Sequence, residues 1–212
     1  MTISMNPVYI LSGARTPFAV WARGKKGDGS PGGALKDADH FDLGAAAVKG
    51  ALARARISPS QIDRVVYGNA YHAGSHSVYG ARYVSLRAGI PENVPCLTAS
   101  MACGTGLYAL IAGAQEVAIG QSELLIAGGT DNVSQIPKNV FAPSFKDLSC
   151  GQDISKTVND LALEFGVSRQ AQDLWALRSH KLAAQARQNG KLAEEIVPVN
   201  NINEDDNILK EP

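Results

Sequence analysis

The sequence has little of what would assign a protein to several common classes. Its 20 basic and 20 acidic residues give a formal net charge of zero, and no basic stripe or cluster marks a surface for nucleic acid or anionic membrane. No stretch approaches the roughly 18 uninterrupted apolar residues that a membrane span requires. The N-terminus has neither the basic region nor the apolar core of a signal peptide. We therefore expect a globular protein with no nucleic-acid partner and no membrane partner.

Cysteine and histidine are scarce as well. The three cysteines are odd in number and show no Cys-x-x-Cys spacing, which argues against a disulfide framework: Cys96, Cys103 and Cys150. Free thiols suit the reducing cytoplasm, where we expect the protein to work. The four histidines match no catalytic motif and are expected to be surface or structural residues: His40, His72, His76 and His180.

What the sequence does contain is an alternation of strand and helix patterns. Short apolar runs predict four strands, at 8–11, 64–69, 94–98 and 124–127. Helical periodicity predicts helices between them, at 42–56 with Asp42 as N-cap, at 77–88, and from Cys103 to about residue 120. The glycine-rich, charged residues 23–39 predict a surface loop. The alternation is typical of an α/β sandwich with a largely parallel sheet.

The pattern changes after residue 129. Residues 130–153 predict a loop, and two helices follow at about 155–165 and 169–188, the second with Ser168 as N-cap. Residues 195–199 predict an exit strand, and the polar, acidic stretch after it adds no closing element. We therefore divide the chain into an α/β domain, residues 1–129, and a mostly helical loop subdomain, residues 130–212.

One stretch does not fit an ordinary core. Residues 100–120, SMACGTGLYALIAGAQEVAIG, place Cys103 at a strand-to-helix junction, followed by Gly104 and Gly106. A helix N-terminus stabilises a thiolate, and backbone N–H groups at Gly104 could hold an oxyanion. That geometry suits a cysteine that accepts an acyl group. The four residues 103–106 alone favour the other interpretation, a structural cysteine in a packed turn, because free cysteine is commonly buried.

Further motifs along the chain change that balance. Seven of them, in order, are 12–17 (SGARTP), 42–44 (DLG), 67–69 (YGN) with 81–82 and 88–91, 103–107 (CGTGL), 127–134 (AGGTDNVS), 172–173 with 178–179, and 195–199 (EIVPV). In this set and this order the chain resembles the thiolase family, whose nucleophile motif is usually Cys-Gly-Ser-Gly. The match is dispersed over nearly the whole length of the chain.

The resemblance implies a layered α/β/α/β/α enzyme of which this chain is the first half. By analogy, Cys103 takes an acyl group as a thioester, and a carbon–carbon bond is formed or cleaved between coenzyme A thioesters. The chain would be the N-terminal half of an acetyl-CoA acetyltransferase or 3-ketoacyl-CoA thiolase. Acetyl-CoA and other acyl-CoA molecules are then its substrates, and no metal or redox cofactor is required. The family also suggests a homo-oligomer.

The other catalytic groups of the family are absent. A histidine base, a second cysteine and an Asn–water oxyanion hole belong to motifs of the family's second half (Asn-Glu-Ala, Gly-His-Pro and Cys-x-Gly), and none occurs here. Where the family often has His-Met before a loop-domain helix, this chain has Asp153 and Ile154. Ile154 is our candidate substrate-binding residue, lining the acyl pocket.

The helix behind Cys103 points to the same missing half. Between Leu107 and Ile119 its only charge is Glu116, and a helix that is apolar on most sides is buried on most sides. Leaving about four large apolar side chains exposed would forgo roughly 6–12 kcal/mol. We therefore expect either a piece of a longer thiolase or one subunit of a split one, associating with a C-terminal half or with itself.

Two alternatives stay open. The first is a non-catalytic thiolase-fold subunit that binds acyl-CoA or lipid, or acts as a scaffold, which the departures at Asp153 and Ile154 favour. The retention of Cys103 between its flanking small residues argues against it. The second is a decarboxylating ketosynthase, which shares the layered fold, although residues 14–17 (ARTP) and 127–132 suit a thiolase better.

Overall fold

A small parallel sheet organises the first part of the chain. The computed structural model describes residues 5–20, 32–72 and 76–209. Within these ranges the strands are β1 (Arg64–Gly68), β2 (Cys96–Ala99) and β3 (Leu125–Gly129). The helices are α1 (His40–Ala55), α2 (Gly80–Arg87), α3 (Thr105–Ala118), α4 (Lys138–Phe141), α5 (Ile154–Glu164), α6 (Arg169–Gln188) and α7 (Lys191–Glu195).

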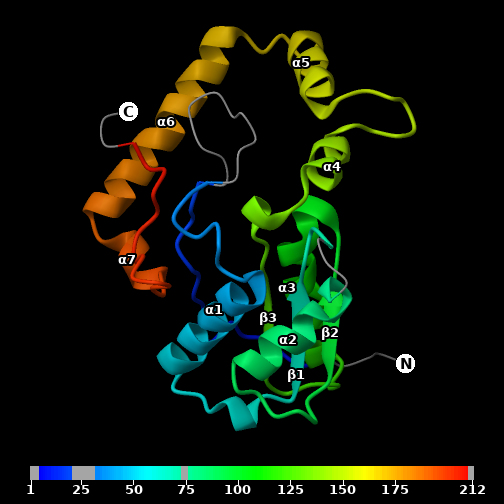
Figure 1. The fold of residues 1–212 in the computed structure, drawn as a ribbon, viewed down its shortest axis with the longest axis vertical. Helices are drawn as coiled ribbons and strands as arrows, with labels where there is room; N and C mark the ends of the chain where they lie inside the picture. The colour runs from blue at the N-terminus through cyan, green and yellow to red at the C-terminus, as the bar shows by residue number, and fades with distance from the viewer. Residues whose placement is uncertain (1–4, 21–31, 73–75, 210–212) are drawn as a thin grey trace.

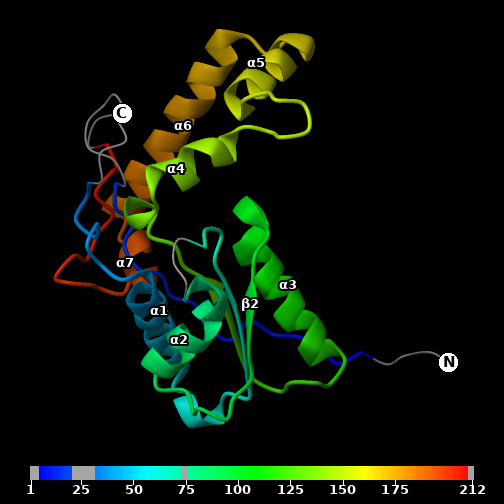
Figure 2. The same ribbon diagram turned by 45° about the vertical axis from the view of Figure 1, so that its right-hand side comes forward.

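Strand β1 is the centre of the sheet, which has the order β2-β1-β3 with all pairs parallel. Its run of apolar residues is typical of a strand covered on both faces, and Val65 and Val66 are fully buried. Val65 and Tyr67 face α1 and α2, while Val66 faces α3, so the sheet lies between two helical layers (Figures 1 and 2). The predicted α/β class with a parallel sheet is confirmed.

Helix α1 begins earlier than the sequence suggested. Asp39, not Asp42, is the N-cap, because its carboxylate accepts a hydrogen bond from the Phe41 N–H at 2.7 Å. Asp42 lies inside the first turn and pairs instead with Arg87 of α2, at 3.0 Å. The turn that precedes the helix ends at residue 38. It brings Asp39 to the cap position, so the prediction of Asp42 was wrong by one turn. The first part of the predicted 23–39 loop lies outside the described residues.

The predicted first strand is not formed. Residues 8–11 pair with no neighbouring strand among the described residues, and Tyr9 and Ile10 are 75% and 85% exposed. An apolar run indicates burial but not what buries it, and among the described residues no strand is hydrogen-bonded to this segment. The exit strand at 195–199 is likewise reduced to isolated bridges, one of which joins Arg15 to Ile196.

Helix α3 packs on the sheet through its smallest residues. Ala109 and Gly113 are buried, and Ala109 contacts Val66 and Ala99. A side chain at Gly113 would have its Cβ 2.8 Å from the Leu125 side chain, so glycine sets how closely the helix approaches. The large apolar side chains of the helix are exposed: Leu107, Tyr108, Leu110, Ile111 and Ile119. The helix therefore presents an apolar face that nothing in the described chain covers.

The second part of the chain forms a helical arm that folds back on the first. Helices α5 and α6 lie within about a residue of their predicted positions, and Ser168 caps α6 by accepting from the Ala171 N–H at 3.2 Å. Residues 130–153 contain α4 and two single turns of 3₁₀ helix. None of the described helices combines the length and apolarity that crossing a membrane demands.

An ion-pair cluster fixes the returning segment. The Arg15 guanidinium donates to both carboxylate oxygens of Asp205, at 2.7 and 2.9 Å, and to Glu195 at 2.8 Å. Burial by itself would raise the pKa of Asp205, but hydrogen bonds from Arg15 and from the Phe18 N–H bring it below its ordinary value. The segment before residue 129, the domain boundary predicted from the sequence, is thus in direct contact with the segment after it.

We predict that Ala109→Leu will destabilise the chain by about 1–3 kcal/mol, because the larger side chain overpacks the contact with Val66. Gln115→Leu is the control, since it adds a similar side chain at an exposed position of the same helix. Urea denaturation followed by circular dichroism measures both. Equal stability of the two variants would contradict the packing described for α3.

Candidate active site

Cys103 lies on a sharp turn at the carboxyl end of the sheet. Strand β2 ends at Ala99, a single 3₁₀ turn covers Ala102–Gly104, and α3 begins at Thr105. The Cys103 side chain is exposed and free of any disulfide. In parallel α/β sheets, ligands bind beyond the carboxyl ends of the strands, so the thiol is both accessible and at the edge where chemistry is expected.

The turn holds one residue in an unusual conformation. Ala102, immediately before Cys103, has φ +45°, in the left-handed region that costs a non-glycine residue roughly 1–2 kcal/mol. Strain of this kind persists only where neighbouring contacts enforce it. We refer to residues 101–105 as the Cys103 elbow.

The side chain of Thr105 closes the elbow. Its Oγ1 accepts a hydrogen bond from the Met101 N–H at 2.8 Å and donates one to the Ala102 carbonyl at 2.7 Å. The Gly104 N–H donates to the Met101 carbonyl at 2.9 Å. Thr105 is 5% exposed. These bonds connect both sides of the strained residue.

The two glycines after Cys103 lie in open space. A Cβ at Gly106 would meet nothing within 4 Å, and one at Gly104 would meet only the Met101 side chain, at 3.7 Å. The chain alone therefore leaves room for an acyl group beside the thiol. Because the Gly104 N–H already donates to Met101, an oxyanion bound there would compete with that carbonyl. The assignment of Gly104 to an oxyanion hole stays a prediction.

Ile154 is not brought close to Cys103 in this structure. It begins α5, is 55% exposed, and both views place α5 well apart from the N-terminal end of α3 (Figures 1 and 2). Its role in an acyl pocket likewise stays a prediction.

Within the described ranges, no acid or base is hydrogen-bonded to the Cys103 sulfur. His40 begins α1 rather than lying in a loop; it is partly buried, with its Nε2 unpaired, and burial lowers its pKa. His76 contacts Tyr83, and His180 lies in α6. Cys96 is half-buried at the start of β2, and Cys150 is exposed in a loop. No group of three potential metal ligands occurs in the described chain.

A buried polar cluster beside the site was missed in the sequence. The Asp131 carboxylate accepts from the Ala70 and Tyr71 N–H groups, at 2.8 and 3.1 Å, and the buried Asn69 side chain donates to the Thr130 carbonyl at 2.6 Å. These bonds tie the carboxyl ends of β1 and β3 together. A signal was present, since Asn69 directly follows β1 and Asp131 lies two residues after the end of β3.

Comparison with known proteins decides the family. The thiolase N-terminal domain matches residues 8–211. The chain belongs to the thiolase family. It is 32% identical, over 92% of its length, to a probable acetyl-CoA acyltransferase of Staphylococcus aureus and to the human mitochondrial 3-ketoacyl-CoA thiolase. The crystal structure of that human thiolase in complex with CoA superposes with a TM-score of 0.84 at 29% identity, covering 95% of this chain.

The match extends over only part of each relative. The chain spans about half the length of the curated thiolases it matches, 51% in both cases, and 54% of the human crystal structure. The expected resemblance to the first half of a thiolase is thereby confirmed.

We predict that Ala102→Val will be less stable than Ala102→Gly by about 1 kcal/mol. Glycine adopts positive φ without strain, whereas a β-branched residue does not. The Ala102 side chain is exposed, so neither variant changes the core. Thermal denaturation of the two proteins measures the difference, and a valine variant as stable as the glycine variant would show that the elbow is not strained.

Proposed function

We propose that this chain is the nucleophile-bearing N-terminal half of a thiolase, active in acyl transfer between coenzyme A thioesters once a C-terminal half is present. The observation that carries the proposal is an exposed Cys103 on a strained elbow at the start of α3. The family assignment and the CoA complex of the human relative support the substrate class.

In the proposed reaction the Cys103 thiolate attacks the carbonyl carbon of an acyl-CoA. The tetrahedral intermediate collapses with release of the CoA thiolate and leaves the acyl group on the sulfur. A second acyl-CoA, deprotonated at its α-carbon, then attacks this thioester and regenerates the Cys103 thiolate. Thiolytic cleavage is the same sequence in reverse. The proton transfers are assigned to the C-terminal half, since Cys103 has no hydrogen-bonded base within the described chain.

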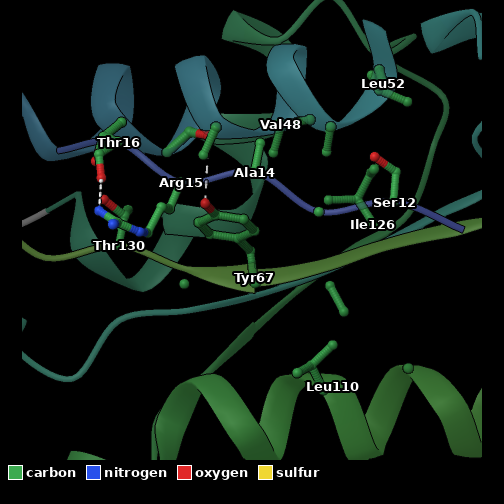
Figure 3. Close-up of a pocket in the computed structure, with 18 of the residues that line it drawn as sticks. Ser12, Ala14, Arg15, Thr16, Val48, Leu52, Tyr67, Leu110, Ile126 and Thr130 are labelled. Carbon is green, nitrogen blue, oxygen red and sulfur yellow. Dashed lines mark hydrogen bonds between the residues drawn. The ribbon is translucent and has the colours of Figure 1, made fainter. Parts of the chain in front are cut away.

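An apolar cavity supports the need for a second half. It has a volume of about 1050 Å³ and lies between the N-terminal segment, α1, β3 and α3. Figure 3 shows Ala14 and Arg15 passing between α1 and the sheet, with Leu110 of α3 on the other side. The open edge of β3 borders this cavity. An unpaired strand edge can accept an added strand, so this cavity is suited to receiving polypeptide.

The exposed face of α3 supports the same conclusion. Leu107, Leu110 and Ile111 are 45–66% exposed and also line the cavity. Full burial of a large apolar side chain contributes about 1.5–3 kcal/mol, so covering the exposed half of each contributes roughly half of that. We place the C-terminal half against this face and this cavity. Assembly into a homo-oligomer and a cytosolic location, suited to three free thiols, are parts of the same proposal.

Acylation of the sulfur tests the chemistry. We expect acetyl-CoA, added to the chain assembled with a thiolase C-terminal half, to leave an acetyl group on the Cys103 peptide, measured by mass spectrometry. Cys103→Ala should abolish the adduct, and Cys150→Ala, which removes another exposed thiol, should not. Acyl-CoA binding that is unchanged in Cys103→Ala, with no adduct in the parent protein, would instead support the non-catalytic binding subunit.

The uncovered apolar surface generates a separate prediction. The chain alone should self-associate and bind a hydrophobic dye, because α3 and the cavity expose contiguous apolar side chains. Adding the C-terminal half should suppress both signals in proportion to complex formation. Light scattering and dye fluorescence measure this. A cooperatively folded monomer that binds no dye would remove the argument for a missing half.

A further inference from the structure

We propose that Thr105 is a positioning residue that holds the Cys103 elbow in its strained conformation from two sides, one polar and one steric. This proposal rests on the proposed function, because the elbow matters only if Cys103 reacts. The polar side is the pair of hydrogen bonds from Thr105 Oγ1 to Met101 and Ala102. The steric side is the contact of the Thr105 methyl group with Gly68.

Among the described residues, the Thr105 hydroxyl is the side-chain group that hydrogen-bonds on both sides of the strained Ala102, to the Met101 N–H and the Ala102 carbonyl. Thr105 is 5% exposed, so water cannot readily replace its hydroxyl. Without it, the Met101 N–H loses its acceptor and the Ala102 carbonyl loses a donor. Ala102 is then free to relax towards negative φ, since strain persists only where surroundings enforce it. Such relaxation moves Cys103 relative to the N-terminus of α3.

The methyl group fixes where the elbow sits on the sheet. A Cβ at Gly68, the last residue of β1, would collide with Thr105 Cγ2, whereas its other neighbours lie at ordinary contact distance, 3.5 Å. Gly68 is thus glycine because a threonine side chain occupies its Cβ position. The methyl distinguishes this elbow from one carrying serine, and it couples β1 to the conformation of the nucleophile.

The test uses the chain itself and no acyl-CoA. Iodoacetamide alkylates thiolates, and the rate at the Cys103 peptide is followed by mass spectrometry with the Cys150 peptide as internal reference. Thr105→Val keeps the shape and removes the hydroxyl, and we expect the Cys103 rate to fall by about fivefold or more, the effect of one lost hydrogen bond. Thr105→Ser keeps the hydroxyl but leaves a gap beside Gly68, so we expect its Cys103 rate to fall less than that of Thr105→Val.

A second threonine supplies the matched control. Thr98 Oγ1 accepts a hydrogen bond from the Ala81 N–H at 3.1 Å, away from the elbow. Thr98→Val therefore loses a hydrogen bond of the same kind without touching residues 101–105. We expect Cys103 to react at the parent rate in this variant. If Cys103 were alkylated as slowly in Thr98→Val as in Thr105→Val, the loss of rate would reflect general destabilisation of the chain, and the proposal would be overturned.

The steric side is tested by exchanging the methyl group. Gly68→Ala alone should slow alkylation, because the new Cβ displaces Thr105. Gly68→Ala combined with Thr105→Ser should restore the rate, because serine lacks Cγ2. These two variants keep the test decisive if Thr105→Val fails to fold. A rate unchanged in Gly68→Ala, or not restored in the double variant, would overturn the steric part.

The alkylation result separates this proposal from the proposed function. Dependence of the Cys103 rate on Thr105 together with no acylation by acetyl-CoA would leave the positioning role standing and reject the enzymatic activity. Acylation of Cys103 by acetyl-CoA, together with an alkylation rate that does not change in the Thr105 variants, would support the enzymatic activity and reject the positioning role.

Discussion

The structure depends on how closely α3 can approach the central strand. Ala109 packs on Val66, Gly113 leaves room for Leu125, and Gly68 leaves room for the Thr105 methyl. Larger side chains at these positions would lift the helix from the sheet. Because Cys103 directly precedes the helix, the same close packing determines where the thiol lies. Backbone proximity between β1 and α3 is therefore the common origin of the core and of the candidate site.

Helix α3 packs closely on the sheet, but its large apolar side chains are left exposed to solvent. Small residues make the contact with the sheet, whereas Leu107, Leu110 and Ile111 remain 45–66% exposed and line the cavity. A helix that covered only one sheet face would show the reverse arrangement, with large apolar residues inward and polar residues outward. Small residues against the sheet, together with exposed large apolar residues elsewhere on the helix, are typical of a helix that is buried between two layers. The chain spans about half the length of the curated thiolases that it matches.

The sequence predicted the elements whose signals are local. The buried run of β1, the Ser168 cap of α6 and the junction at Cys103 are encoded by residues adjacent in the chain, and each is observed. The failures involve information that is not local. Residues 8–11 are apolar enough for a strand but pair with no strand of the described chain. The choice of Asp39 over Asp42 depends on where the preceding turn ends.

In the candidate site, too, the features encoded by adjacent residues could be predicted and those that depend on the fold could not. The Cys103 junction could be recognised from the motif at 103–107, whereas the positive φ of Ala102 and the hydrogen bond between Asn69 and Asp131 are seen only in the fold. No pattern in the sequence indicates that a threonine hydroxyl bonds to both sides of the residue before Cys103. Such contacts depend on backbone directions that a linear pattern does not contain.

The conformation of the Cys103 elbow is determined within this chain, whereas the environment of the Cys103 sulfur is not. Every group that shapes the elbow, from Met101 to Thr105 with Gly68 beneath it, belongs to this chain, so its conformation can form before any partner binds. The surroundings of the thiol, in contrast, are not completed by the described chain: the sulfur is open to solvent and has no hydrogen-bonded base there. Desolvation strengthens electrostatic stabilisation in active sites. Under the proposed function, binding of a second half would therefore change the reactivity of Cys103 without having to form the elbow. Assembly in this view supplies the proton transfers and excludes water, and leaves the geometry of the sulfur to the packing of α3 on β1.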